Sequence, residues 1–255
     1  MKKFFTIASL LALTLSACSE KVAQGEQKSE GRVTINLETS SEVADTRAAI
    51  GCQTPTADDF ALTIEGVEHT FTSEYASVAE FNEDNYLHYG SYKATVVAGD
   101  VNDEGYDKVA FVGSQEFAVE ARKDVEVEIT ATIANAIVKV ETTERFDSYF
   151  EGGHSLKLVT AAGNEFDVTN QSDLLFIAPE LFTISGTATK QPAQSGAEGV
   201  VVTLPEYKPE SIVAQTLYTV KFDVETVGSA TLNITLNEAL VESIDIEQEL
   251  NDNAQ

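Results

Sequence analysis

The densest group of residues able to bind a metal ion lies in a short polar segment near the middle of the chain. It holds Asp100, Asn102, Asp103, Glu104 and Asp107 around Gly105. Hard oxygen ligands on a tight, glycine-containing loop are the chemistry that Ca²⁺ prefers. Their spacing does not match the twelve-residue calcium loop, and acidic turns between strands are common. We therefore predict no metal site, with Asp100, Asn102, Asp103 and Asp107 as the strongest candidates if one exists.

Residue groupings typical of enzymes are absent from the sequence. His69, His88 and His154 are far apart, and none has a Cys or a second His at the spacing of metal ligands. The chain contains no Gly-x-Ser-x-Gly elbow, no phosphate-binding Walker loop and no His-Glu-x-x-His motif. Cys52 has no His and Asp nearby that would make it a nucleophile. We predict that the protein is not an enzyme.

A second cysteine, close to the N-terminus, points to a covalent modification. Lys2 and Lys3 precede an almost uncharged apolar run, which ends in Leu15-Ser16-Ala17-Cys18. This layout is typical of a secretion signal, and its end resembles the lipobox of bacterial lipoproteins, whose cysteine thiol receives a diacylglycerol before the signal is removed. The run is shorter than the about 20 residues that a membrane-spanning helix needs. An ordinary secreted protein with an accidental cysteine is the alternative.

Acylation at Cys18 sets the expected location and composition of the mature chain. Residues 1–17 are then the signal peptide, the covalent lipid is the only cofactor, and two or three acyl chains hold a protein on a membrane almost permanently. Removing two lysines leaves 14 basic and 42 acidic residues, a net charge of 14 − 42 = −28. Such a field repels nucleic acid and anionic lipid headgroups, so neither is an expected partner. Once Cys18 is acylated, Cys52 has no disulfide partner.

Beyond a polar tether at 18–31, the chain reads as many short strands. Apolar residues alternate with polar ones, most clearly from Asp124 to Ile133, where the period of two indicates one buried face. The other expected strands lie at 33–38, 59–66, 89–96, 111–119, 136–142, 154–160, 165–168, 174–177, 182–188, 199–204, 218–224, 232–236 and around 244–246. We expect a bend at Gly113, a hairpin turn at Gly228-Ser229, and an extended or loop conformation for 71–81. No long amphipathic helix is predicted.

Strands joined by turn-rich loops over this length favour an all-β fold with two tandem antiparallel β-sandwich domains. We place the N-terminal domain at 32–134, the C-terminal domain at 135–250 and a polar tail at 251–255. The boundary lies where the strand ending at Ile133 leads almost directly into the strand that begins at Ala136.

The order of these features resembles a known family. After the lipobox cysteine come a first strand, Thr46-Arg47-Ala48, an Asp59-Phe60 strand entry, the Tyr89-Gly90-Ser91-Tyr92 turn, a strand from Gly113 to Val119, and Ala136-Ile137-Val138-Lys139-Val140. This order resembles Bacteroidales surface lipoproteins of the domain of unknown function 4493 type, which are similar to the fimbrillin superfamily. The resemblance covers nearly the whole mature chain and rests on order more than on rare residues.

The resemblance implies transthyretin-like, fimbrillin-like domains and an assembly mechanism. In fimbrillins an arginine-specific protease removes the first strand, and another subunit's terminal strand fills the groove. In this chain the cut would fall between Arg47 and Ala48. The exchanged strands would be 33–38, with Val33, Ile35 and Leu37, and 244–250, with Ile244 and Ile246. Acidic residues at 242, 245, 247 and 249 are unusual for a strand that fills a dry groove.

Two functions of different class follow. The first is a structural or adhesive lipoprotein of the outer membrane, at the cell surface or facing the periplasm, whose partners are fimbrial subunits or surface ligands and which is either cut at Arg47 or stays anchored whole. The second is a surface lipoprotein that captures glycans, with Tyr86, Tyr89 or Tyr149 stacking on sugar rings. The absence of tryptophan argues against the second function, because Trp is the strongest stacking platform.

Overall fold

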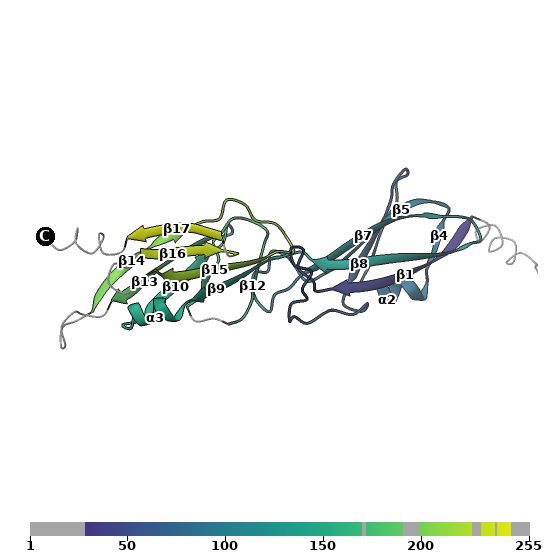
Figure 1. Ribbon diagram of the computed structural model, residues 1–255. Helices are drawn as coiled ribbons and strands as arrows, with labels where there is room; N and C mark the ends of the chain where they lie inside the picture. Colours follow the sequence, from purple (N-terminus) through teal and green to yellow (C-terminus); the bar gives the residue numbers. More distant parts are fainter. Residues whose placement is uncertain (1–28, 170–171, 191–198, 226–230, 238, 246–255) are drawn as a thin grey trace, which may run out of the picture.

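The computed structural model describes residues 29–169, 172–190, 199–225, 231–237 and 239–245. Its secondary structure is mostly β-strand, as predicted, in an elongated arrangement with the N-terminal strands at one end and β14, β16 and β17 at the other (Figure 1). The sheets are mainly antiparallel, but β1 pairs in parallel with β8, and β9 pairs in parallel with β15. Within the described residues, no helix is long and apolar enough to span a membrane.

The first sheet has seven strands in the order β3-β2-β5-β7-β8-β1-β4. They are β1 (Glu30–Ser40), β2 (Ala61–Gly66), β3 (Thr72–Tyr75), β4 (Tyr86–His88), β5 (Gly90–Ala98), β7 (Phe111–Val119) and β8 (Asp124–Ile133). β7 pairs with β8 only at Phe111 and Val112, whereas β7 pairs along its full length with β5. Because β7 and β8 separate after those two positions, the sheet divides into two layers that enclose one core.

Two further sheets make up the C-terminal half. The four-stranded sheet has the order β11-β10-β13-β14, and the six-stranded sheet has the order β17-β16-β15-β9-β12-β6. The strands are β6 (Gly105–Tyr106), β9 (Ala136–Thr142), β10 (His154–Val159), β11 (Glu165–Asp167), β12 (Leu175–Ile177), β13 (Thr183–Lys190), β14 (Val200–Tyr207), β15 (Leu217–Val224), β16 (Thr231–Leu236) and β17 (Ala239–Asp245). β15 and β16 pair as the predicted hairpin, whose turn lies outside the described residues.

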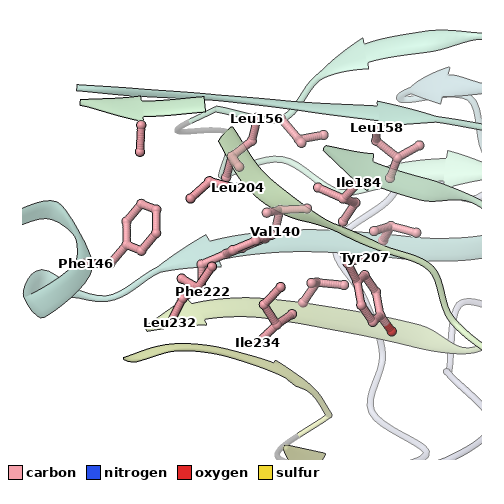
Figure 2. Close-up of a cluster of buried hydrophobic side chains, with 14 of the residues drawn as sticks. Val140, Phe146, Leu156, Leu158, Ile184, Leu204, Tyr207, Phe222, Leu232 and Ile234 are labelled. Atoms are coloured by element: carbon pink, nitrogen blue, oxygen red, sulfur yellow. The ribbon is translucent and has the colours of Figure 1, made fainter. Parts of the chain in front are cut away.

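The inward faces of these two sheets form a second core (Figure 2). Leu156, Ile184 and Leu204 of the four-stranded sheet face Val140, Phe222 and Ile234 of the six-stranded sheet. Tyr218, Val220, Phe222 and Val224 alternate along β15 and are all buried, as their spacing predicts.

Tyr207 introduces a hydroxyl group into this core. Its side chain is 2% exposed, and the hydroxyl has no hydrogen-bond partner among the described residues. Burial raises the pKa of Tyr207 to about 12. Since the unfolded side chain has a pKa of about 10, the folded state binds this proton more tightly, and the resulting stabilisation is lost as the pH rises from about 10 through about 12.

We therefore expect Tyr207→Phe to leave the free energy of unfolding unchanged or to raise it by about 1 kcal/mol, because no buried hydroxyl then lacks a partner. The variant should also lose less stability between neutral and strongly alkaline pH. Tyr218→Phe is the matched control, since the Tyr218 hydroxyl oxygen accepts a hydrogen bond from the Val213 backbone at 2.8 Å and its loss should destabilise. Denaturant titrations at both pH values would measure this, and equal destabilisation by the two variants would contradict the prediction.

Two short helices correct the sequence prediction. Residues 71–81 were expected to be extended or loop, which holds for 71–77, including β3, but α2 (Val78–Glu83) begins at Val78. The Ser77 hydroxyl caps this helix by accepting from the Glu80 backbone, and the Glu80 carboxylate accepts from the Ala76 backbone. Ser-x-x-Glu before an apolar run is an N-terminal helix signal that the sequence displays. α3 (Glu144–Tyr149), capped by Thr143, was not predicted.

The predicted bend at Gly113 is wrong, because β7 continues without a break from Phe111 to Val119. A Cβ atom at position 113 would lie 2.8 Å from the Thr130 carbonyl oxygen and 3.0 Å from the Ala131 Cα. Position 113 is therefore glycine because β8 approaches closely, and not because the chain turns. Close approach of another backbone is one of the common reasons for a glycine inside a strand.

The segment between β8 and β9 joins the two cores. Asn135 is fully buried, and its side-chain oxygen accepts a hydrogen bond of 2.6 Å from the Ala110 backbone. The first residues of β9 are buried on both faces: Ala136 and Val138, with Val140 farther along, belong to the second core, whereas Ile137 packs in the first. Phe176 of β12 also packs in the first core. The two halves therefore share an apolar contact and are not joined by a linker alone.

Candidate functional site

The first strand, β1, lies inside the first sheet between β8 and β4. Nine consecutive residues, from Arg32 to Ser40, pair with β8, and residues 30–32 pair with β4. Val33 and Ile35 are buried and Leu37 is partly buried in the first core, as their alternation predicts. Removing β1 would expose both the backbone edge of β8 and the apolar side chains beneath it.

The loop after β1 presents Arg47 to solvent. Glu42 and Ala49 form an antiparallel bridge, and the Val43 backbone N–H donates to the Ala48 carbonyl at 3.0 Å. Arg47 lies at the tip of this turn with a φ of 54°, and its neighbours from position 44 to 49 are exposed. The peptide bond after Arg47 is therefore accessible to a protease, provided that the turn opens, because proteases bind extended chain.

The same loop contacts the C-terminal half through Gln215. The side-chain amide of Gln215 donates to the Glu42 backbone carbonyl at 2.9 Å, and the backbone carbonyl of Gln215 accepts from the Ala44 backbone N–H at 2.7 Å. Beside this contact lies a cleft of about 510 Å³ between the loop and the outer face of the six-stranded sheet. Its lining includes Val43, Asp45, Thr46, Leu217, Thr235 and Asn237.

The other residues predicted for strand exchange are described only in part. Ile244 lies in β17, opposite Leu232 of β16, and β17 is an edge strand that pairs on one side only. Ile246 and the lipidation residue Cys18 lie outside the described residues. Cys52 is half-buried, and burial raises the pKa of its thiol, which disfavours the reactive thiolate.

The segment considered as a calcium loop connects the two halves. Asp100 accepts hydrogen bonds from Asn102, and Asp103 forms an exposed ion pair of 2.7 Å with Lys108. Asp107 does not join them in a metal site, because the described residues contain no cluster of three or more His, Cys, Asp or Glu side chains suited to a metal ion.

The Glu104 carboxylate is the centre of this connection. It accepts from the Thr160 hydroxyl at 2.6 Å, the Asn164 amide at 2.7 Å and the Ala178 backbone at 3.0 Å. β6, the next two residues, pairs with β12, so that a loop of the N-terminal half supplies an edge strand to the six-stranded sheet. We call Glu104 with its three donors the clasp.

The histidines lie in three separate places, as expected. His69 packs edge-on against Tyr92 with ring centroids 4.9 Å apart, and His88 lies 3.6 Å from Glu30. His154 packs against the ring of Phe146. No two of them approach each other among these contacts, so the structure gives no reason to assign them a catalytic role.

Of the tyrosines considered for sugar stacking, Tyr86 and Tyr89 are exposed by 57% and 67%. Tyr149 is not available for stacking, because it is 7% exposed and the Lys190 ammonium lies 4.9 Å from its ring centroid. Tyr149 lies in α3, a helix that was not predicted, and its burial agrees with the alternative that such tyrosines pack at the edges of the sandwich.

A small pocket beside Tyr86 was not predicted. It has a volume of about 270 Å³ and is lined by Glu30, Arg32, Tyr86, Arg122, Lys123 and Asp124. Three of the chain's few basic residues thus lie together, although Arg32 is about 90 residues from Arg122 and Lys123 in the sequence. Only the pairing of β1 with β8 and β4 brings them to one place.

Comparisons with known proteins identify a family but not a function. The chain matches the family model described as "Domain of unknown function (DUF4493)" over residues 29–252. No curated protein matches it.

Solved structures with a similar arrangement include a candidate polysaccharide-binding protein (DUF1812) from Bacteroides thetaiotaomicron, at 11% identity and a TM-score of 0.41, covering 85% of this chain and 99% of that chain. The fimbrial anchor protein Mfa2 from Porphyromonas gingivalis is similar at 9% identity and a TM-score of 0.38, over 84% of this chain and 99% of that one. Similarities at this level do not establish a function. The family match covers most of the sequence, and the chain belongs to the family of domain of unknown function 4493.

Proposed function

We propose that the protein is a non-enzymatic structural or adhesive lipoprotein of the outer membrane, attached through a lipid on Cys18 and displayed at the cell surface. The observation that carries the proposal is the position of β1. This strand is inside the first sheet and contributes Val33 and Ile35 to its core, yet the chain on its C-terminal side is the exposed Arg47 loop.

Strand exchange follows from this position as the finer part of the proposal. After a cut between Arg47 and Ala48, β1 is held only by non-covalent contacts, chiefly its pairing with β8 and β4 and the packing of Val33 and Ile35 in the core. Its departure leaves nine unpaired backbone positions on β8 and an apolar groove, which together favour addition of a strand from another subunit. The segment 244–250, which begins at the end of the edge strand β17, is the donor that we propose.

An arginine-specific protease tests this part of the proposal. We expect a new N-terminus at Ala48. After β1 is lost, we expect oligomers that remain associated at low temperature and dissociate on boiling. Arg47→Ala should abolish both results. Arg122→Ala is the matched control, because Arg122 is also exposed, in a turn with a φ of 63°, and its replacement should leave cutting at Arg47 intact.

Mass spectrometry of the cell-envelope protein distinguishes the processed form from the intact form. A mature start at Ala48 supports the processed form. An intact, acylated Cys18 after exposure to the protease would contradict processing and leave the protein as an anchored surface lipoprotein.

Glycan capture is the second candidate function, and the exposure of Tyr86 and Tyr89 beside a pocket is the observation that favours it. Affinity electrophoresis in gels containing plant or host polysaccharides would test it. Retardation that is lost in a Tyr86→Ala, Tyr89→Ala double variant would support this function, and no retardation by any polysaccharide would remove it.

A further inference from the structure

The pocket beside Tyr86 lies where the described chain begins. The Tyr89 backbone N–H donates to the Ser29 carbonyl at 2.8 Å, and the Arg122 backbone N–H donates to the Glu30 carbonyl at 2.7 Å. The turn between β7 and β8 and the turn between β4 and β5 therefore flank the first residues of β1. These elements form one end of the elongated molecule, opposite β14 and β16 (Figure 1). We call this surface, made by Arg32, Tyr86, Tyr89, Arg122 and Lys123, the proximal face.

The proximal face combines exposed aromatic rings with guanidinium groups that lack ion-pair partners. Tyr86 and Tyr89 are the only aromatic side chains among the large apolar residues exposed in the described chain. Lys123 pairs with Glu120, but no ion pair of the described residues includes Arg32 or Arg122. The Arg32 side chain donates a hydrogen bond to the Asn85 amide oxygen at 3.2 Å. The chain has 16 basic and 42 acidic residues, yet these two guanidinium groups are in no ion pair and can bind an external anion.

We propose that, in the uncut and tethered form, the proximal face lies against the phosphate layer of the bilayer. This inference rests on the proposed acylation of Cys18. The ten residues between Cys18 and Ser29 can span at most about 35 Å when fully extended. The tether therefore keeps Ser29, and the face that bears it, within about 35 Å of the membrane surface. Tyrosine rings favour the interface between water and lipid, and arginine binds phosphate oxygens in a bidentate manner.

The net charge of the protein opposes this contact only at long range. At physiological ionic strength, exposed charges are screened over about 8 Å, so the many carboxylates farther along the molecule contribute little at the proximal face. Glu30, Glu120 and Asp124 are the acidic groups at the face itself. Glu120 is paired with Lys123, and Glu30 faces His88 at 3.6 Å. The expectation that anionic headgroups are excluded as partners thus applies to the whole chain and not to this end.

The absence of tryptophan from the chain makes the proposal directly testable. The chain starting at Cys18 and carrying Cys52→Ser is coupled through its one thiol to a maleimide lipid in vesicles of three parts phosphatidylcholine and one part phosphatidylglycerol. Tyr89→Trp then places one fluorescent reporter on the proximal face. Val201→Trp is the matched control, because Val201 is 65% exposed and lies in β14 at the other end.

We expect brominated lipids to quench the Tyr89→Trp emission at least two-fold and to leave the Val201→Trp emission unchanged. Adding Arg122→Glu to the first reporter should reduce the quenching, since a carboxylate replaces a phosphate-binding group. Equal quenching of the two reporters, or none at position 89, would overturn the proposal. So would a Tyr89→Trp emission that responds to soluble acidic oligosaccharides and not to vesicles. Because the anchor is attached chemically, these outcomes do not depend on natural acylation, which labelled palmitate tests separately.

Discussion

Glu104→Ala is expected to lower the free energy of unfolding by about 2–4 kcal/mol and to uncouple the two halves of the molecule. The clasp consists of one carboxylate and three donors, of which the Thr160 hydroxyl belongs to a residue that is 6% exposed. Hydrogen bonds to a charged group contribute about 1.5–3 kcal/mol, and donors left buried without a partner cost a further amount. The three bonds act as a unit, so their contributions will not simply add.

The uncoupling has its own signature. The wild-type protein should unfold in one transition as long as the clasp, the pairing of β6 with β12 and the packing of Ile137 and Phe176 hold the halves together. In Glu104→Ala, the two halves should unfold in two separate transitions, because part of this interface is lost. Circular dichroism and limited proteolysis would detect the two transitions.

Asp103→Ala is the matched control for the clasp. Asp103 is the neighbouring acidic residue and forms an ion pair with Lys108, but both side chains are more than half exposed. Exposed pairs contribute about 0–1 kcal/mol, so this variant should be close to wild type and should keep a single transition. If Asp103→Ala and Glu104→Ala have the same effect, the clasp does not hold the halves together.

The clasp also shows what the sequence could not reveal. The acidic segment around Asp100 reads as a loop with calcium-like composition, and nothing in its order indicates that Glu104 alone faces Thr160, Asn164 and Ala178. Those donors lie 56 to 74 residues farther along the chain. The composition of a segment can indicate that it is a polar loop. Its hydrogen-bond partners depend on how the two halves pack together, and no local sequence pattern encodes that packing.

Strands could be predicted because their signal is local. Val127, Ile129, Ala131 and Ile133 alternate with polar residues, and each is at most 2% exposed in β8. The same rule fails where a strand is buried on both faces or where a glycine has two meanings. Ile137 gave no sign that it would pack in the other core, and Gly113 was read as a bend although it marks close contact with β8. The proximal face likewise could not be predicted from the sequence, because its residues come from separate strands and turns.

Gly186→Ala is expected to destabilise the protein by about 3 kcal/mol. Gly186 pairs with Leu156 of β10 on one side and Leu204 of β14 on the other, beside an irregularity in the register of β13. An added Cβ would overlap the Ser155 carbonyl oxygen and would lie 2.9 Å from Leu156 Cδ2. The carbonyl belongs to the backbone of a paired strand and cannot rotate away. Overpacking of this kind costs about 1–3 kcal/mol and sometimes more.

Gly51→Ala is the matched control, because a Cβ at position 51 would meet no atom within 4 Å. The same methyl group is added, and the glycine is removed from an exposed segment, where the loss of freedom in the unfolded chain can stabilise slightly. Chemical denaturation of the two variants should therefore give changes of opposite sign or at least a difference of about 2 kcal/mol. Equal stabilities would mean that the backbones of β10 and β13 can move apart at Gly186 and that their close approach there is not needed for stability.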